Sequence, residues 1–114
     1  MIDSRTKGAA GEREFAHLCK DHGYDGARRG QQFSGIEGED VVGLPGVHIE
    51  VKRVEALNIE KAMAQSIRDA RAGELPIVAH RKNRGKWMIT MPAEQWFKVY
   101  RKWEAGQMKY DGSF

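Results

Sequence analysis

The segment EDVVGLPGVHIEVK, Glu39 to Lys52, places two runs of strand-forming residues on either side of a glycine and proline turn. This pattern predicts a β-hairpin, in which successive side chains point to opposite faces of the sheet. Glu50 and Lys52 then share one face, and Ile49 and Val51 share the other. We therefore expect one face of the hairpin to be core and the other to carry polar chemistry.

The first strand of the hairpin adds a second acid, Asp40. A strict two-residue turn at Pro45-Gly46 would pair Asp40 with Val51 and send Asp40 and Glu50 to opposite faces. We expect both carboxylates on one face, which requires an odd-length loop, a bulge, or an Asp40 just outside the ladder. Neighbouring carboxylates repel unless a cation lies between them, and oxygen ligands suit Mg²⁺, for which Mn²⁺ can substitute. The hairpin thus predicts a metal site.

Composition restricts the class of protein. The 114 residues predict a single domain, 1–114, and 19 Lys and Arg against 16 Asp and Glu give a net charge of +3, which favours polyanions as partners. The one cysteine, Cys19, cannot form an intrachain disulfide, and a reducing compartment is favoured. No signal peptide or apolar run of membrane-spanning length is visible. We expect a soluble protein of the bacterial or host-cell cytoplasm.

Periodicity and turn residues predict the remaining elements. Residues 7–22 predict an amphipathic helix stopped by Gly23, and residues 25–39 a long mobile loop with a short strand near 27–29. The next expected element is a helix that is capped by Asn58, has a buried stripe that includes Ile67, and is ended by Gly73. After it we expect a strand over 75–80, a basic turn over 82–86, a strand over 87–91, a helix from Pro92, and a flexible tail over 106–114. This order predicts an α/β fold, a mixed central sheet flanked by helices.

Four aromatic residues recur at helical spacing in the last helix: Trp96, Phe97, Tyr100 and Trp103. Such a stripe is typical of a core or a dimer contact, and base stacking is the alternative. His48 lies on the predicted face of Glu50, where a solitary histidine is usually structural or solvated rather than a metal ligand. The basic turn is either solvated or in contact with phosphate.

Asp40, nine residues, and then Glu50-Val51-Lys52 resemble the signature of the PD-(D/E)XK nucleases. The helix segment KGAAGEREF, residues 7–15, and the glycine-rich Phe33-Ser34-Gly35 resemble archaeal-type Holliday junction resolvases. The similarity covers about residues 7 to 90. It implies a restriction-endonuclease-like core and a metal-dependent endonuclease from a phage or bacterial source.

The resemblance also implies a role for each site residue. The implied metal ligands are Asp40, Glu50 and the Val51 carbonyl, with Glu12 in support of the metal and Lys52 near the attacking water. The chemistry of these groups agrees, because phosphodiester cleavage needs a cation to neutralise charge and activate water, and a lysine can orient the water or the phosphate. Glu14 is the alternative to Glu12, since both flank the apolar stripe of their helix.

The chain departs from the family pattern in two places. A proline normally precedes the aspartate, and here Glu39 stands instead, which makes Glu39 and Glu37 candidates to share the metal. The helix after the lysine often carries an early glutamine, where this chain has Lys61, with Gln65 one turn later.

The expected substrate is DNA, a four-way junction or other branched DNA, cut by a homodimer whose two active sites nick paired strands. The expected DNA contacts are Arg28, Arg29, Ser34, Arg53, Lys61, Gln65, Arg81, Lys82, Arg84 and Lys86. Flaps, forks and nicked duplex are alternative substrates. A catalytically idle nucleic-acid-binding module is the alternative class of protein.

Overall fold

The computed structural model describes residues 4–30 and 39–111, which fold around a five-stranded sheet. The strands are β1 (Arg28–Arg29), β2 (Val41–Val42), β3 (Val47–Arg53), β4 (Leu75–Arg81) and β5 (Met88–Thr90), and the helices are α1 (Ser4–Asp21), α2 (Ile59–Asp69) and α3 (Ala93–Asp111). The predicted α/β class, a mixed sheet flanked by helices, is confirmed and is consistent with a restriction-endonuclease-like core.

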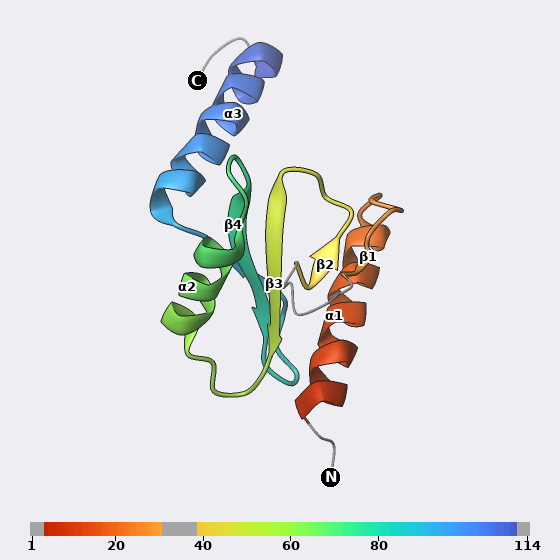
Figure 1. The fold of residues 1–114 in the computed structure, drawn as a ribbon. Helices are drawn as coiled ribbons and strands as arrows, with labels where there is room; N and C mark the ends of the chain where they lie inside the picture. The colour runs from red at the N-terminus through yellow and green to blue at the C-terminus, as the bar shows by residue number, and fades with distance from the viewer. Residues whose placement is uncertain (1–3, 31–38, 112–114) are drawn as a thin grey trace.

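The strands lie in the order β1-β2-β3-β4-β5. β3 and β4 are parallel and are joined through α2, whereas the other neighbouring pairs are antiparallel. α1 and α2 lie on opposite sides of β3, and α3 projects beyond the end of the sheet (Figure 1). The two long central strands therefore receive a helix on each face, as a mixed sheet with a helical crossover requires.

The hydrophobic core lies between α1 and the sheet. α1 contributes Phe15, Ala16 and Cys19, and the sheet side contributes Ala27, Val41, Ile49, Val51, Ile77 and Ala79. The Phe15 ring also contacts Trp87, with their centroids 5.1 Å apart. Gly23 follows α1 with φ +98°, which confirms the predicted glycine stop. Ile49 and Val51 thus face the core, as the alternation along the hairpin predicts.

The start of α2 is as predicted, but its end is not. Asn58 caps the helix by accepting a hydrogen bond from the Lys61 amide at 3.0 Å. The helix ends at Asp69, because the next residue is already extended, and Gly73 (φ +84°) belongs to the turn that follows. The predicted burial of Ile67 is also wrong: its side chain is 54% exposed, since α2 faces the sheet through Ala62 and Ser66.

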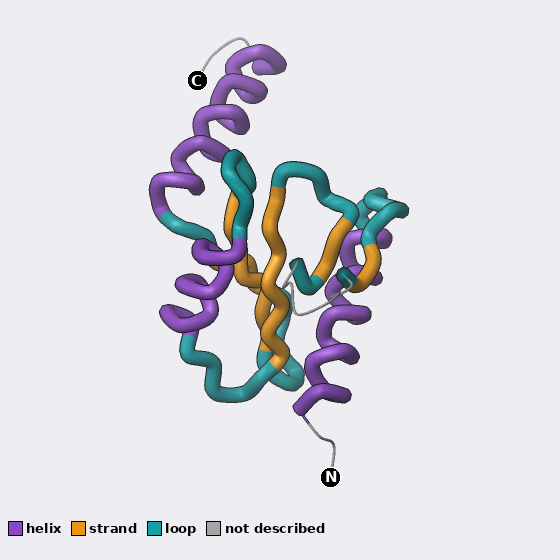
Figure 2. The backbone as a smooth tube through the Cα atoms, viewed as in Figure 1, coloured by secondary structure: helices purple, strands orange, loops and turns teal. Residues whose placement is uncertain are grey.

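The predicted flexible tail is wrong over residues 106–111, because α3 continues through Gly106 to Asp111. A glycine inside a helix costs about 1 kcal/mol, which the continuing main-chain hydrogen bonds offset. Figure 2 shows α3 as one helix that extends away from the strands. β1 matches the short strand expected within the segment 25–39, and residues 31–38 and 112–114 lie outside the described chain. No helix of the described residues is long and apolar enough to cross a membrane.

Candidate active site

The register of the hairpin brings Asp40 and Glu50 to the same face. β2 pairs antiparallel with β3, with Val41 opposite Ile49, and both side chains are buried in the core. Continuing this register places Asp40 opposite Glu50, one residue away from the register of a strict two-residue turn. Asp40 precedes the first residue of β2, so the expectation that it lies just outside the ladder is confirmed.

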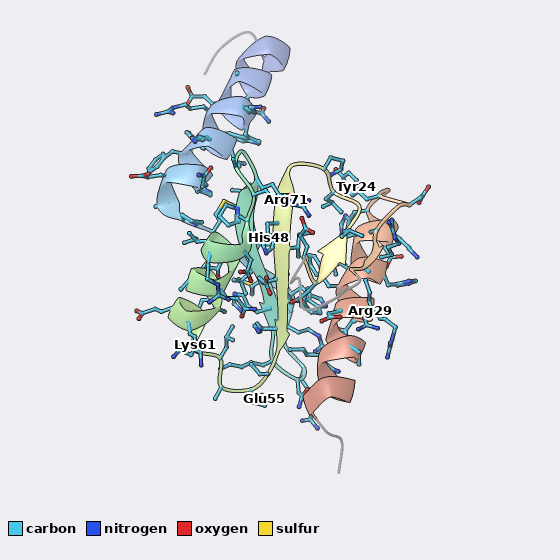
Figure 3. All side chains as sticks on the ribbon, viewed as in Figure 1. Tyr24, Arg29, His48, Glu55, Lys61 and Arg71 are labelled. Carbon is cyan, nitrogen blue, oxygen red and sulfur yellow. The ribbon has the colours of Figure 1, made fainter. Side chains whose placement is uncertain are left out.

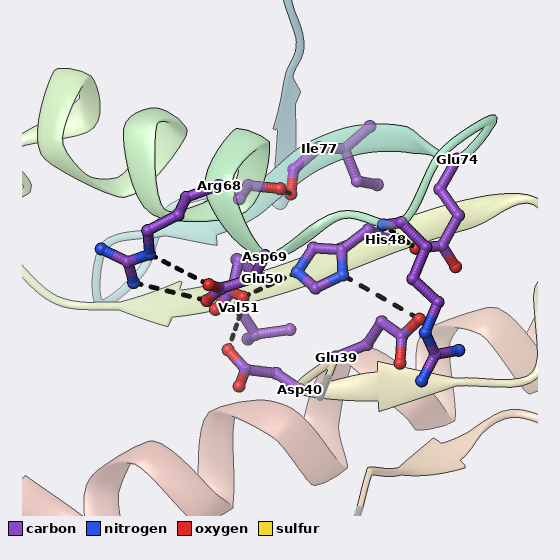
Figure 4. A network of polar contacts seen from close by, with 11 residues as sticks. Glu39, Asp40, His48, Glu50, Val51, Arg68, Asp69, Glu74 and Ile77 are labelled. Atoms are coloured by element: carbon purple, nitrogen blue, oxygen red, sulfur yellow. Dashed lines mark hydrogen bonds and ion pairs between the residues drawn. The ribbon is translucent and has the colours of Figure 1, made fainter. Parts of the chain in front are cut away.

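Main-chain hydrogen bonds hold Asp40 against the edge of β3. The Asp40 amide donates to the Ile49 carbonyl at 2.9 Å, and its carboxylate Oδ2 accepts from the Val51 amide at 2.8 Å (Figure 4). Because β2 is only two residues long, it does not extend along β3 as far as Val51, and the Val51 amide donates to the Asp40 side chain instead of to a longer β2. The carboxylate is thereby fixed beside Glu50.

Asp40 and Glu50 lie with Lys52 and Glu12 around one cavity of about 260 Å³. Glu12 comes from α1, Asp40 from the start of the hairpin, and the other two from β3. The remaining lining residues are Gly8, Val51, Arg53, Val54 and Gln65. The four polar residues whose catalytic roles the family resemblance implies are therefore brought together from three separate segments of the chain.

The two carboxyls lie close together in one cavity, and each acts on the charge of the other. The pKa of Asp40 is raised from 3.8 to about 7, first by burial and second by the negative charge of Glu50, which is itself 1% exposed. The Val51 amide and, more weakly, Lys52 act in the opposite direction. Buried carboxyls this close share a proton at neutral pH or hold a cation in its place. Their oxygen donors fit a hard divalent cation such as Mg²⁺.

The structure separates the two acids of α1. Glu12 lines the cavity and accepts a hydrogen bond from Arg29 Nε at 2.8 Å. Glu14 is turned to another cluster, where it accepts hydrogen bonds from Arg81 and, at 3.0 Å, from Trp87 Nε1. These contacts lower the pKa of Glu14, and the Arg81 hydrogen bond is the largest cause. Of the two alternatives, only Glu12 faces the carboxylate cavity.

Lys61 and Gln65, the two residues of α2 near the position of the family's glutamine, differ in which cavity they line. Gln65 lines the carboxylate cavity and also the neighbouring groove, which Lys61 and Lys52 share. Gln65 is therefore a lining residue of the carboxylate cavity, whereas Lys61 lines the neighbouring groove. Figure 3 shows Lys61 on α2 and Arg29 beside α1, on either side of β3.

His48 contacts the candidate site in a way that sequence reasoning missed. Its ring is 1% exposed, and its Nε2 lies 2.9 Å from Glu50 Oε1 (Figure 4). When Glu50 is ionised it can only accept, and Nε2 then donates the hydrogen of this contact. The i, i+2 spacing on one strand face was the available signal for this pair. The partner of His48 is thus a residue of the candidate site.

Glu39 faces the opposite side of His48 from Glu50. Its Oε1 lies 3.9 Å from His48 Nδ1, and Glu39, His48 and Glu74 each offer a ligand atom within 4.8 Å of the others. Glu39 does not line the cavity of Asp40 and Glu50. It therefore does not lie beside the carboxyls of that cavity, and the other candidate, Glu37, lies outside the described residues.

The predicted DNA contacts divide into exposed cations and paired ones. Lys82, Arg84 and Lys86 are exposed on the turn between β4 and β5, and the Asn83 amide of this turn donates to Glu55 beyond β3 at 2.8 Å.

Arg28 is exposed and donates to the Gly26 carbonyl, whereas Arg29 is bonded to Glu12. Arg81 is bonded to Glu14 and lies over the Trp87 ring. Ser34 lies outside the described residues.

Arg53 lies between the carboxylate cavity and the cluster of Glu14. It lines the carboxylate cavity, and its Nε lies 3.7 Å from Glu14 Oε2. This buried Nε has no hydrogen-bond partner within the described chain. The guanidinium at the mouth of the cavity is thus only loosely paired, in contrast to Arg81.

Comparison with protein-family models finds a match over nearly the whole chain. The model of a family described as phage putative PDDEXK endonuclease matches residues 3–112, nearly the whole chain. No curated protein and no solved structure matches.

Proposed function

This chain belongs to the family of phage putative PDDEXK endonucleases, and from that membership we propose that it is a Mg²⁺-dependent endonuclease that cuts branched DNA in the manner of a Holliday junction resolvase. PD-(D/E)XK nucleases are metal-dependent enzymes that act on DNA. The observation that carries the proposal is the cavity shared by Asp40, Glu50, Lys52 and Glu12, in which the pKa of Asp40 is raised to about 7.

In the proposed site, Asp40, Glu50 and the Val51 carbonyl hold the cation, and Glu12 supports it from α1. The bound cation neutralises the charge that develops on the phosphate and supplies a nucleophile from water. Asp40 is held for this task by the Val51 amide, which occupies Oδ2. His48 Nε2 lies 2.9 Å from Oε1 of Glu50, and this contact fixes the carboxylate beside Asp40.

Lys52 is the proposed partner of the attacking water or the scissile phosphate. It lies in the same cavity as the carboxylates and comes from the same face of β3 as Glu50. Gln65 approaches from α2 and offers amide hydrogen bonds to the same space. Hydrolysis by this site requires no side-chain nucleophile.

The proposed selectivity for branched DNA rests on position rather than base readout. The exposed cations are distributed between β1 and the turn after β4, and both bind phosphate without reading sequence. A homodimer with two such sites meets phosphates on two strands at once, and the shape of a junction decides which phosphates those are.

A panel of DNA substrates tests the proposal. Four-way junctions with unrelated arm sequences, three-way junctions, flaps, forks, nicked duplex and linear duplex of equal length are incubated with the protein in Mg²⁺ or in EDTA, and the cuts are mapped. We expect paired cuts in all four-way junctions, little cleavage of linear duplex, and none in EDTA. Equal cleavage of linear duplex would favour a general nuclease, and binding without any cleavage in Mg²⁺ or Mn²⁺ would favour an idle binding module.

A further inference from the structure

α3 carries an exposed aromatic face, which we define as Trp96, Phe97, Tyr100 and Trp103. Trp96, Phe97 and Trp103 are 46%, 52% and 54% exposed. An amphipathic helix normally turns its apolar stripe toward the core of its own domain. This helix does not, and three of these rings are about half exposed within the part of the chain that the structure describes.

The opposite side of α3 faces the body of the protein. Lys98 and Lys102 line a shallow groove together with Gly73 and Leu75, where the turn after α2 leads into β4. At about 100° per residue these lysines lie on the far side of the helix from Trp96 and Trp103. The side chains toward the body are thus largely polar, and the aromatic face points away from it.

The aromatic rings are already stacked on one another. Trp96 and Tyr100 stack with their centroids 5.3 Å apart, and Tyr100 and Trp103 stack at 5.7 Å. Bases that bind to a stacking platform need free ring faces and nearby cations for the phosphates. Here the ring faces are partly used within the helix, and Lys98 and Lys102 lie on its other side. The aromatic face therefore suits a flat apolar protein surface better than a nucleic acid.

The exposed area is of the size that a dimer needs at its centre. A half-exposed ring offers roughly 100 Å², so the aromatic face offers roughly 350 Å² per chain once the partly covered Tyr100 is included. A patch of that size equals the largest apolar patch of a typical soluble monomer, and such patches are often functional. A rim of flanking polar residues brings such a patch toward the roughly 800 Å² per partner of a specific interface.

We infer that the aromatic face of α3 is the surface through which two copies of this chain associate. One patch that meets its own copy forms a two-fold contact, which closes at two chains. The aromatic face does not line the carboxylate cavity, so both cavities stay open in such a dimer. This inference names the surface of the homodimer in the proposed function, but the association itself requires no nuclease activity.

The test measures the mass of the full chain in solution. We expect sedimentation equilibrium between about 1 and 100 μM to give twice the mass of one chain. The double variant Trp96→Ser/Trp103→Ser should associate at least about 100-fold more weakly. The matched control Lys98→Ser/Lys102→Ser changes the other side of the same helix and should remain a dimer, as should the conservative variant Trp103→Phe.

Several results would overturn the inference. A wild-type chain that is monomeric at 100 μM, or a double variant that dimerises as tightly as wild type, would do so. Loss of junction binding by a double variant whose association is unchanged would instead assign the aromatic face to DNA. Far-UV circular dichroism checks that the variants fold, and their helix content should equal that of wild type. Because mass is measured without substrate, an inactive protein that still dimerises would contradict the proposed function alone.

Discussion

Two groups of carboxylates lie on either side of β3, and their electrostatic surroundings are opposite. In the cavity, Asp40 lies beside Glu50, and its pKa is raised to about 7 by burial and by that second negative charge. In the other group, Glu14 is bonded to Arg81 and Trp87 and lies near Arg53, and its pKa is lowered. Glu14 is held by cations of the protein, whereas the main electrostatic neighbour of Asp40 is a second carboxyl, Glu50. An acid that is paired internally serves the fold, and acids that repel each other mark the place where an external cation binds.

The largest expected difference between the two groups is in catalysis. Asp40→Asn and Glu50→Gln should each slow cleavage in Mg²⁺ at least about 1,000-fold, or about 4 kcal/mol in the barrier, because each removes a proposed metal ligand. Junction binding should be unchanged or tighter, since a negative charge near phosphate is removed. Single-turnover cleavage and binding titrations measure both quantities.

Glu14→Gln is the matched control for these variants and should cleave at nearly the wild-type rate. Lys52→Ala should lose cleavage with the ligand variants. Wild-type cleavage by Asp40→Asn would remove Asp40 from the set of ligands. Full activity of Lys52→Ala would assign the orientation of water to another group.

The second expected difference is in how stability depends on pH. The folded protein holds the Asp40 proton more tightly than the unfolded chain, so the contribution of Asp40 to stability is present at acid pH and is lost as pH rises from about 4 through about 7. Without metal, the ionisation of Asp40 should cost roughly 4 kcal/mol at pH 8. Asp40→Asn should therefore be more stable than wild type at pH 8 in EDTA and about equally stable at pH 4.

Urea unfolding at pH 4 and pH 8 measures this difference. Excess Mg²⁺ at pH 8 should stabilise the wild type, because it binds only the folded state, and should have little effect on Asp40→Asn. Parallel pH profiles for the two proteins would show that Asp40 is not under the repulsion inferred here.

A third difference separates two acids on the same helix. Glu12→Gln should reduce cleavage about 10- to 100-fold, the effect of losing a group that supports a metal ligand, and should change stability little. Glu14→Gln should leave cleavage near normal but destabilise the fold by about 1 kcal/mol at pH 7, a modest value because its side chain is 36% exposed.

The destabilisation by Glu14→Gln has its own pH dependence. The lowered pKa of Glu14 contributes stability above its ordinary value of 4.5, which is lost as pH falls through the folded pKa. The gap between Glu14→Gln and wild type should therefore shrink on acidification, as thermal melts at pH 7 and pH 3 would show. The reverse outcome, in which Glu14→Gln loses activity and Glu12→Gln loses stability, would exchange the roles of the two acids.

The smallest expected effects distinguish exposed cationic side chains from those that are paired with a carboxylate. Lys82→Ala and Lys86→Ala should each weaken junction binding and lower the slope of log affinity against log salt by about 1, because each removes one phosphate contact. Lys20→Ala, an exposed change near the other end of α1, is the matched control. Arg81→Ala should instead lower stability, since Arg81 is already paired with Glu14. Unchanged salt slopes for both lysine variants would exclude the turn from the DNA contact.

The alternation of the segment Glu39 to Lys52 was enough to predict which side chains of β3 face the core. It was not enough to predict the hairpin register, because turns of different length shift the register by one residue and exchange the faces of the first strand. The pairing of Val41 with Ile49 decided that Asp40 joins Glu50. The choice between Glu12 and Glu14 had the same character, since both flank the buried stripe and only the packing of α1 against β3 orients them.

Local signals predicted some helix boundaries and not others: the start of α2 and the glycine stop of α1 are as predicted, but α1 begins at Ser4 and not at residue 7. Asn58 caps α2 through a hydrogen bond formed within four residues, so the sequence determined it. Gly73 and Gly106 looked like endings, but α2 stops earlier and α3 continues. A glycine permits a helix to end, and the neighbouring contacts decide whether it does.

The sequence by itself determined the α/β class, the order of the elements, the acid-rich hairpin and the aromatic stripe of the last helix. These features depend on side-chain periodicity, turn residues and caps, all of which act over a few residues. Only the tertiary structure decided that Asp40 lies beside Glu50, that Glu12 and not Glu14 faces them, that His48 contacts Glu50, and that the aromatic face points away from the body. Each of these depends on which segments, distant in sequence, share one small volume, because desolvation and charge act through space and not along the chain.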